Sequence, residues 1–411
     1  MKRRKFLQSL GPFVSASLLA VPALSGAGIL RSAQAGSKLR ITGMDTFIVR
    51  ATERTNWIFV RLSTNQGLTG LGEASLGRQT GLSELEDFFN LVREQSPFGI
   101  ERYRQQGIGR ASVGTLRVAT AFSAIEQAQW DLVGKALDAP VHELFGGRLR
   151  DRLLVYANIN RATSDRTPEG FAATAAAAVA DGNGFGGLKA APFDGFPLPS
   201  AGPQKIEAAT DLGVACVEAI RGAVGPSIEI KIDCHSFFDV ERSISVARRL
   251  EPQRLSWYEE PISPTQVENT RAIKDAISQP MAGGEFLFGM SGFNELCSRQ
   301  AVDIIMPDVK HCGGLQEGRN IAALAALHNV AVSPHNPSGP VSTFASAQLC
   351  ASMTNFDILE YQWGEVDWRS DLVTPPERFE NGTISVPDGP GLGVELNDQL
   401  VREHLASRNV K

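Results

Sequence analysis

The chain of 411 residues has few cysteines and no excess of positive charge. Its five cysteines show no short regular spacing, which excludes a disulfide framework and a zinc-finger pattern. The formal net charge of −5 at pH 7 argues against nucleic acid and anionic membrane surfaces as partners, because both are bound by a positive face. A hydrophobic fraction of 43% with 21% charged residues is typical of a soluble globular chain, and the length indicates two domains or three.

The first 35 residues differ from the rest of the chain. They open with Lys2-Arg3-Arg4-Lys5-Phe6-Leu7 and end with Ala33-Gln34-Ala35, a small-x-small pattern typical of a cleavage site. Glycine and proline interrupt the apolar stretch between them, which disfavours a membrane-spanning anchor. We therefore expect residues 1–35 to be a twin-arginine type signal peptide on a bacterial protein that is periplasmic or otherwise exported, with no stable membrane anchor after cleavage. Removal of this segment takes the formal net charge from −5 to about −10.

Residues 36–150 have the pattern of a small α+β domain. Residues 39–74 contain strand-like runs separated by the turn signal Asn65-Gln66-Gly67. A helical face follows, with apolar residues spaced three or four apart, at Phe122, Ile125, Ala128 and Leu132. The sequence Asp138-Ala139-Pro140 predicts the end of that helix.

Residues 151–361 alternate short apolar runs with alanine-rich helical segments. Eight strands are expected, at residues 153–159, 187–190, 228–234, 255–258, the segment before Glu285, 302–307, 330–334 and 356–359. This α/β pattern favours a parallel βα barrel, with a doubly wound open sheet as the alternative.

Six ionisable residues stand at the ends of successive expected strands. They are Asp233, Glu259, Glu285, Asp308, His335 and Glu360, with separations of 26, 26, 23, 27 and 25 residues. One strand, one helix and two loops consume about that length before the chain returns to the same face of a barrel. Converging carboxylates at the ends of buried strands indicate a divalent metal, and hard oxygen ligands favour Mg²⁺ over Zn²⁺.

Several short motifs, in their order and spacing, resemble the enolase superfamily and within it the mandelate racemase subgroup. These motifs are Gly72-Glu73-Ala74, residues 124–132, Tyr258-Glu259-Glu260-Pro261, Gly284-Glu285, Met306-Pro307-Asp308, Gly313-Gly314 and Pro334-His335. The resemblance implies a modified TIM barrel, (β/α)7β, with an α+β capping domain. The barrel would span residues 151–361, and the C-terminal segment 362–411 would return to the N-terminal capping domain.

The same resemblance assigns roles to individual residues. It implies metal ligands at Asp233, Glu259 and Glu285. Asp308 and His335 resemble the family's Asp-His dyad, in which His335 would be the base and Asp308 would hold its tautomer and keep its pKa high. Glu360 matches a carboxyl group that hydrogen-bonds the substrate carboxylate.

The reaction depends on the groups opposite the dyad. A racemase of the subgroup has Lys-x-Lys where this chain has Lys189-Ala190-Ala191, which argues against two-base racemisation. Asp233-Cys234-His235 resembles the arrangement in galactonate and mannonate dehydratases, where the histidine is the acid. Lys189 would either stabilise the substrate carboxylate or form a structural ion pair. The pattern therefore favours Mg²⁺-dependent dehydration of an aldonate to a 2-keto-3-deoxy acid, through α-proton abstraction and an enediolate.

Two other functions stay open at this point. One is an epimerase, racemase or cycloisomerase of sugar acids or lactones, and the other is a non-catalytic periplasmic protein that binds a sugar acid. Arg78, in a cap loop, would bind a distal hydroxyl or second carboxylate of the substrate, or would be a solvated loop residue. A small-molecule sugar acid is the expected partner, and we expect a homo-oligomer.

Overall fold

The computed structural model describes residues 38–79 and 82–406. The predicted signal peptide, residues 1–35, lies outside the described residues. Residues from Leu39 onward form one compact unit. Within the described ranges, no helix is long and apolar enough to cross a membrane.

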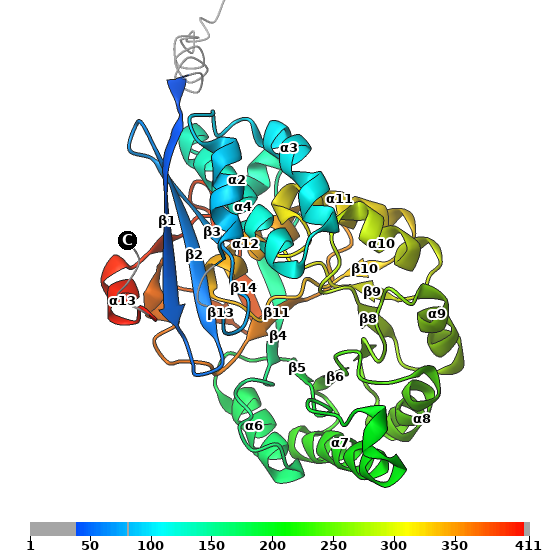
Figure 1. Cartoon of the computed structure of the whole chain (residues 1–411). Helices are drawn as coiled ribbons and strands as arrows, with labels where there is room; N and C mark the ends of the chain where they lie inside the picture. The colour runs from blue at the N-terminus through cyan, green and yellow to red at the C-terminus, as the bar shows by residue number, and fades with distance from the viewer. Residues whose placement is uncertain (1–37, 80–81, 407–411) are drawn as a thin grey trace, which may run out of the picture. The chain divides into compact units, whose positions relative to one another are not determined.

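The N-terminal part is an antiparallel meander covered by helices (Figure 1). Its strands are β1 (Ile41–Arg50), β2 (Asn56–Thr64) and β3 (Thr69–Glu73), and its helices are α2 (Glu84–Val92), α3 (Ile100–Val113) and α4 (Leu116–Leu137). Strand β3 lies directly on α4, since a Cβ at Gly72 would come within 2.1 Å of the Ala124 carbonyl oxygen. The predicted helix end is confirmed, because Asp138 takes the left-handed conformation with φ of 54°.

The eight predicted barrel strands are confirmed within residues 152–362, all of which the structure describes. They are β4 (Arg152–Asn158), β5 (Gly187–Ala190), β6 (Glu229–Asp233), β7 (Trp257–Glu259), β8 (Met281–Gly283), β9 (Ile304–Ile305), β10 (Ala331–Val332) and β11 (Leu359–Gln362). Consecutive strands pair in parallel from β4 to β10, and β11 pairs with β4. A parallel bridge between Val332 and Phe356 closes the ring, which rules out the open sheet. The last strand begins three residues later than predicted, so Glu360 lies inside it.

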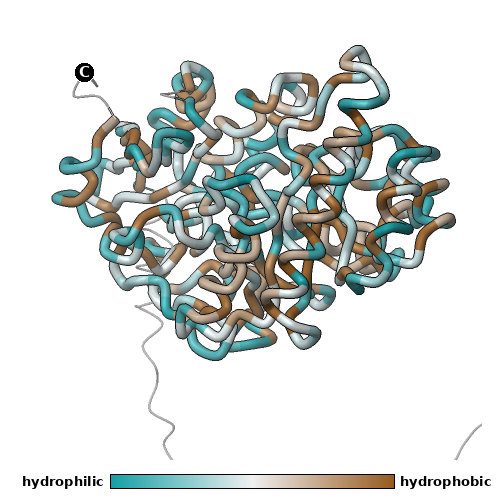
Figure 2. Tube along the Cα trace, turned by 90° about the horizontal axis from the view of Figure 1, so that it is seen from below, coloured by the Kyte–Doolittle hydropathy of each residue, from teal (hydrophilic) through white to brown (hydrophobic). Residues whose placement is uncertain are grey.

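Seven helices alternate with these strands in the fully described range 152–362, which is the (β/α)7β order. They are α6 (Pro168–Ala180), α7 (Pro203–Val224), α8 (Val240–Leu250), α9 (Val267–Ala276), α10 (Gly289–Ser298), α11 (Gly314–Leu327) and α12 (Pro340–Ser352). The short helix α5 (Val141–Leu144) precedes β4, and two 3₁₀ turns lie at Pro199–Ala201 and Glu251–Gln253. Figure 2 shows hydrophobic and hydrophilic stretches alternating along the chain, as expected where each helix buries one face.

The chain after the barrel contacts both the barrel and the first sheet. Its elements are a 3₁₀ turn (Ser370–Leu372), β12 (Val373–Thr374), β13 (Phe379–Glu380), β14 (Thr383–Ser385), β15 (Glu395–Leu396) and α13 (Asp398–Glu403). Asn381 and Gly382 form the hairpin turn between β13 and β14, with φ of 50° and 70°, and β14 pairs with β4. Beyond α13, a bridge between Leu405 and Val49 joins the tail to β1.

Candidate active site

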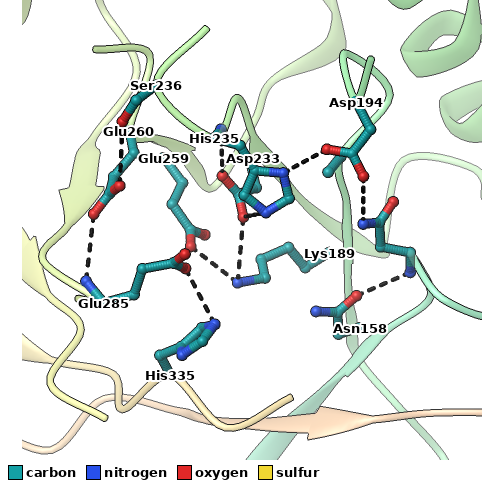
Figure 3. Close-up of polar contacts among 12 residues, drawn as sticks. Asn158, Lys189, Asp194, Asp233, His235, Ser236, Glu259, Glu260, Glu285 and His335 are labelled. Atoms are coloured by element: carbon teal, nitrogen blue, oxygen red, sulfur yellow. Dashed lines mark hydrogen bonds and ion pairs between the residues drawn. The ribbon is translucent and has the colours of Figure 1, made fainter. Parts of the chain in front are cut away.

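Three carboxylates meet at the carboxyl ends of the barrel strands (Figure 3). Asp233 ends β6, Glu259 ends β7, and Glu285 follows β8. Each offers one oxygen, and these oxygens all lie within 4.8 Å of one another. All three side chains are buried. The tertiary structure thus brings together the three acids that the family resemblance implied as metal ligands.

The electrostatics of this cluster favour a cation between the acids. Burial, and next the charge of Asp233, raises the pKa of Glu259 to about 8. The same two causes raise the pKa of Glu285 well above its usual value. Glu285 Oε2 is buried without a hydrogen-bond donor among the described residues. Three buried carboxyl groups with one oxygen left without a donor fit a divalent metal ion, because carboxylate charge costs a great deal to bury without a cation.

Lys189 lies between this cluster and Glu360. Its Nζ is 2.9 Å from Glu259 Oε1, 2.9 Å from Glu360 Oε1 and 3.9 Å from Asp233 Oδ2. Burial opposes the charge of Lys189, but the two glutamates outweigh it and hold its pKa well above the usual value. Lys189 is therefore a fixed ammonium in this structure. It cannot act as a base in this state, because a lysine base must be neutral.

Glu360 is fully occupied by donors from the protein. Its Oε1 also accepts from Asn158 Nδ2 at 2.6 Å, and its Oε2 accepts from the Asn336 backbone N at 2.8 Å. The side chain is 0% exposed and is not among the residues that line the cavity described below. Its predicted contact with a substrate carboxylate stays a prediction, and the contact that is present orients Lys189.

Asp308 and His335 form the predicted pair on the other side of the cluster. His335 Nδ1 is 2.8 Å from Asp308 Oδ2, and His335 Nε2 is 3.1 Å from Glu285 Oε2. Burial lowers the pKa of His335 and outweighs the opposing effects of Glu360 and Asp308. Asp308 raises this pKa, as expected, but burial lowers it by more, and the charge of Lys189 adds to the lowering. A neutral ring that donates from Nδ1 carries its lone pair on Nε2, which suits a base.

His235 is held by two carboxylates. Its Nε2 is 2.9 Å from Asp233 Oδ2, and its Nδ1 pairs with Asp194. Burial opposes the charge, but Asp233 and Asp194 outweigh it and raise the pKa of His235 to about 12. In Figure 3 the imidazoles of His235 and His335 lie on either side of the carboxylate cluster. One ring is therefore protonated and the other neutral, as an acid and a base require.

A cavity of about 320 Å³ lies over these groups. Its wall includes Thr55 and residues 75–77 from the N-terminal part, and Asn158, Arg161 and Gln362 from the barrel. Arg78 is exposed and is not among the lining residues, so its predicted substrate contact stays a prediction.

Lys310, Asp194 and Arg161 are site residues that the sequence analysis missed. Lys310 lines the cavity two positions after Asp308. The two-residue spacing that singled out His235 after Asp233 applies equally to Lys310, so a signal was present. Asp194 and Arg161 lie in loops with no motif. Cys234 lies in the apolar core, and all five cysteines of the chain are free and buried.

Two protein-family models match the chain. The mandelate racemase / muconate lactonizing enzyme N-terminal domain matches residues 45–146, and the enolase C-terminal domain-like model matches residues 171–400.

Curated relatives and solved structures agree with these matches. A D-xylonate dehydratase of Haloferax volcanii is 35% identical over 361 residues, which cover 85% of each chain. A D-gluconate dehydratase of Thermoproteus tenax is 34% identical, over 85% of this chain and 70% of the relative. The crystal structure of a mandelate racemase/muconate lactonizing enzyme from Jannaschia sp. CCS1 has a TM-score of 0.79 and 31% identity, over 90% of this chain and 99% of that one. The chain therefore belongs to the mandelate racemase and muconate lactonizing enzyme subgroup of the enolase superfamily.

Proposed function

We propose that this protein dehydrates an aldonate to a 2-keto-3-deoxy acid with Mg²⁺ as its cofactor. The chain is a hydro-lyase of the enolase superfamily. The observation that carries the proposed mechanism is the placement of His335, which is bonded to Asp308, and His235, which is paired with Asp194, at one cavity and on either side of three carboxylates.

Asp233, Glu259 and Glu285 are the residues that would hold Mg²⁺. When bound, the ion supplies a Lewis acid for the negative charge released as the α-proton leaves, worth several kcal/mol. Lys189 brings a further fixed positive charge beside the same carboxylates. It would thus stabilise charge near the substrate carboxylate while staying protonated.

The proton transfers follow from the two imidazoles. His335 Nε2 takes the proton from the α-carbon, while Asp308 holds the ring by accepting from Nδ1. The C–O bond at the 3-position then breaks, and the proton of His235 leaves with the hydroxyl as water. The resulting enol tautomerises to the 2-keto-3-deoxy acid, so atoms and charge balance.

The substrate class is supported by the relatives. The two named above are dehydratases of D-xylonate and D-gluconate, which are both aldonates. We extend that class to this chain without choosing one sugar. An epimerase would need a second base opposite His335, but Lys189 is held as a cation and Ala191 stands at the second lysine position.

Incubation of candidate aldonates with the protein and Mg²⁺ in deuterated water tests the reaction class. We expect a keto-deoxy product. Deuterium at the α-carbon of unchanged or epimerised substrate would instead indicate an epimerase, and neither product would indicate a binding protein.

His335→Asn tests the base. The variant keeps a group that can hydrogen-bond Asp308 but cannot take a proton. We expect kcat to fall by about 10² to 10⁴ while Mg²⁺ binding, measured by calorimetry, is retained. Turnover at the level of the unaltered protein would remove His335 from the mechanism.

Export is a separate proposal, supported by the twin-arginine pattern of residues 1–35. The N-terminal sequence of protein recovered from a bacterial periplasm tests it. A start at residue 36 is expected, and a cytoplasmic protein that retains residues 1–35 would contradict export.

A further inference from the structure

The two helices that follow the dyad loops have no side-chain cap of their own. Helix α11 starts behind Gly313 and helix α12 behind Gly339, and neither glycine can cap the first turn with a side chain. The first N–H groups of a helix have no partner within it, so buried ones need acceptors from elsewhere. Asp308 lies just before α11, and His335 lies just before α12.

Two buried glutamates of the capping domain supply these acceptors. Glu126 of α4 accepts from the backbone N of Leu315 at 2.7 Å and of Gln316 at 2.9 Å. Glu73, at the end of β3, accepts from the backbone N of Gly339 at 2.7 Å and of Ser342 at 2.8 Å. Both side chains are 0% exposed. Each glutamate thus clamps one barrel helix from the cap, with acceptor oxygens placed at the helix N-terminus.

The barrel backbone is shaped to admit these carboxylates. A Cβ at Gly314 would lie 2.0 Å from Glu126 Oε2, and a Cβ at Gly339 would lie 2.9 Å from Glu73 Oε1. No side chain can occupy either position while the carboxylate is there. The glycines and the glutamates are therefore parts of the same two contacts.

Helix α4 also holds the loop between Asp308 and α11 along one face. The contacts are Thr120 Oγ1 with His311 Nδ1 at 2.9 Å, Gln127 Nε2 to the Val309 carbonyl at 3.1 Å, and the Gly313 backbone N to Ser123 Oγ at 3.1 Å. Residues spaced three or four apart on one helix share a face, so Thr120, Ser123 and Gln127 form a continuous row that Glu126 joins. The loop is fixed on both sides of His311.

We propose that Glu126 and Glu73 are positioning residues that set the loops of Asp308 and His335 from the capping domain. Glu126 holds the Asp308 side of the dyad, and Glu73 holds the His335 side. The expected effect of these two glutamates on kcat rests on the proposed function. Their expected effect on how the two loops are held does not depend on that function.

Asp131 provides a matched control on the same helix. It is also 0% exposed, and it accepts from the backbone N of Leu71 and of Leu392, each at 2.7 Å. Lys135 is its third partner. None of these groups lies in a loop of the dyad, so Asp131→Asn removes the same kind of contact without touching the site.

Hydrogen exchange of the full chain tests the positioning without any substrate. E126Q should speed exchange in residues 308–316 and leave 335–343 unchanged, whereas E73Q should do the opposite, because an amide cannot accept from both N–H groups. D131N should change neither segment. The same result for all three variants, or no local change in E126Q and E73Q, would overturn the proposal.

Kinetics with an aldonate that the unaltered protein turns over gives the second measurement. We expect E126Q and E73Q to lower kcat by about tenfold or more with a smaller change in KM, and D131N to stay within about twofold. If no aldonate is turned over, the proposed function fails while hydrogen exchange still decides the positioning. Should a glutamine variant not fold, E126D and E73D keep the charge with a shorter reach and should show the same local pattern more weakly.

Discussion

The chain buries two sets of acids, one in the cap and one at the barrel mouth, and only the second contains an oxygen without a donor among the described residues. In the cap, Glu73, Glu126 and Asp131 each accept from two backbone N–H groups of other elements. At the barrel mouth, Glu285 Oε2 has no donor in the described part of the chain, and it faces the lone pair of His335 Nε2 at 3.1 Å.

Burial affects the acids of the cap and of the barrel mouth alike, so burial alone does not indicate a functional acid. Burial raises the pKa of Glu73, Glu126 and Asp131, just as it raises those of Glu259 and Glu285. A raised pKa therefore does not distinguish the sets. Glu259 has a donor at each oxygen, Lys189 Nζ and Trp257 Nε1, so a missing partner sets apart only Glu285 Oε2, which a ligand would satisfy.

Glu285→Gln should have the largest effect on activity. It replaces a charged ligand with a neutral one in the cluster that would hold Mg²⁺. We expect kcat to fall by about 10³ or more, with weakened Mg²⁺ binding in calorimetry. D131N, a neutralised acid of the cap, is the control. Similar losses in both variants would erase the distinction between the two sets.

Magnesium should stabilise the protein more strongly at high pH. Glu259 has its pKa raised to about 8 from 4.5, so the stability that it contributes without metal is present below about pH 4.5 and lost as the pH rises through about 8. Mg²⁺ must displace that proton. We expect about 2.7 kcal/mol of stabilisation at a metal concentration of 100 Kd, and a Tm increase that is larger near pH 8.5 than near pH 6.5.

Thermal melts of E285Q at both pH values are the control for that measurement. The variant should show little Mg²⁺-dependent shift. An equal shift in E285Q and in the unaltered protein would place the ion outside the carboxylate cluster.

Asp131→Asn should lower the folding stability more than Glu285→Gln does, although Glu285→Gln should lower the activity more. Asp131→Asn leaves a buried backbone N–H facing an amide donor, which costs about 1–3 kcal/mol. Chemical denaturation without metal measures this cost. E285Q replaces a buried carboxyl group whose Oε2 already lacks a donor, so we expect its stability to be equal to or above that of the unaltered protein. A larger loss in E285Q than in D131N would contradict this.

Arg78→Ala should have the smallest effect. The side chain is exposed and does not line the cavity. We expect kcat/KM to stay within about twofold across candidate aldonates. A selective loss for one aldonate would instead assign Arg78 to substrate binding, as the sequence analysis proposed.

Residues of this site differ in how far the sequence alone could identify them. The repeated strand-to-strand spacing placed six ionisable residues at one end of the barrel, because parallel strands of a closed barrel end on one face, and the family resemblance implied that Asp233, Glu259 and Glu285 are the metal ligands. Glu360 was placed at the end of a strand, but β11 starts later and buries it within the sheet. Loop residues show no periodic pattern in the sequence. Only the folded chain therefore reveals that Asp194 holds His235.

The local pattern of the sequence determined the eight strands, the cap helix and its end, and the ionisable residues that follow successive strands. Each of these depends on residues close in the chain or on a regular repeat. Only the tertiary structure decided that Lys189 is fixed between Glu259 and Glu360. It also decided that Lys310 and His335 both pair with the carboxylate of Asp308, and that the cap glutamates accept from the first turns of α11 and α12. Those last contacts join positions 189 and 266 residues apart, and no local pattern specifies which distant backbone N–H a buried carboxylate will meet.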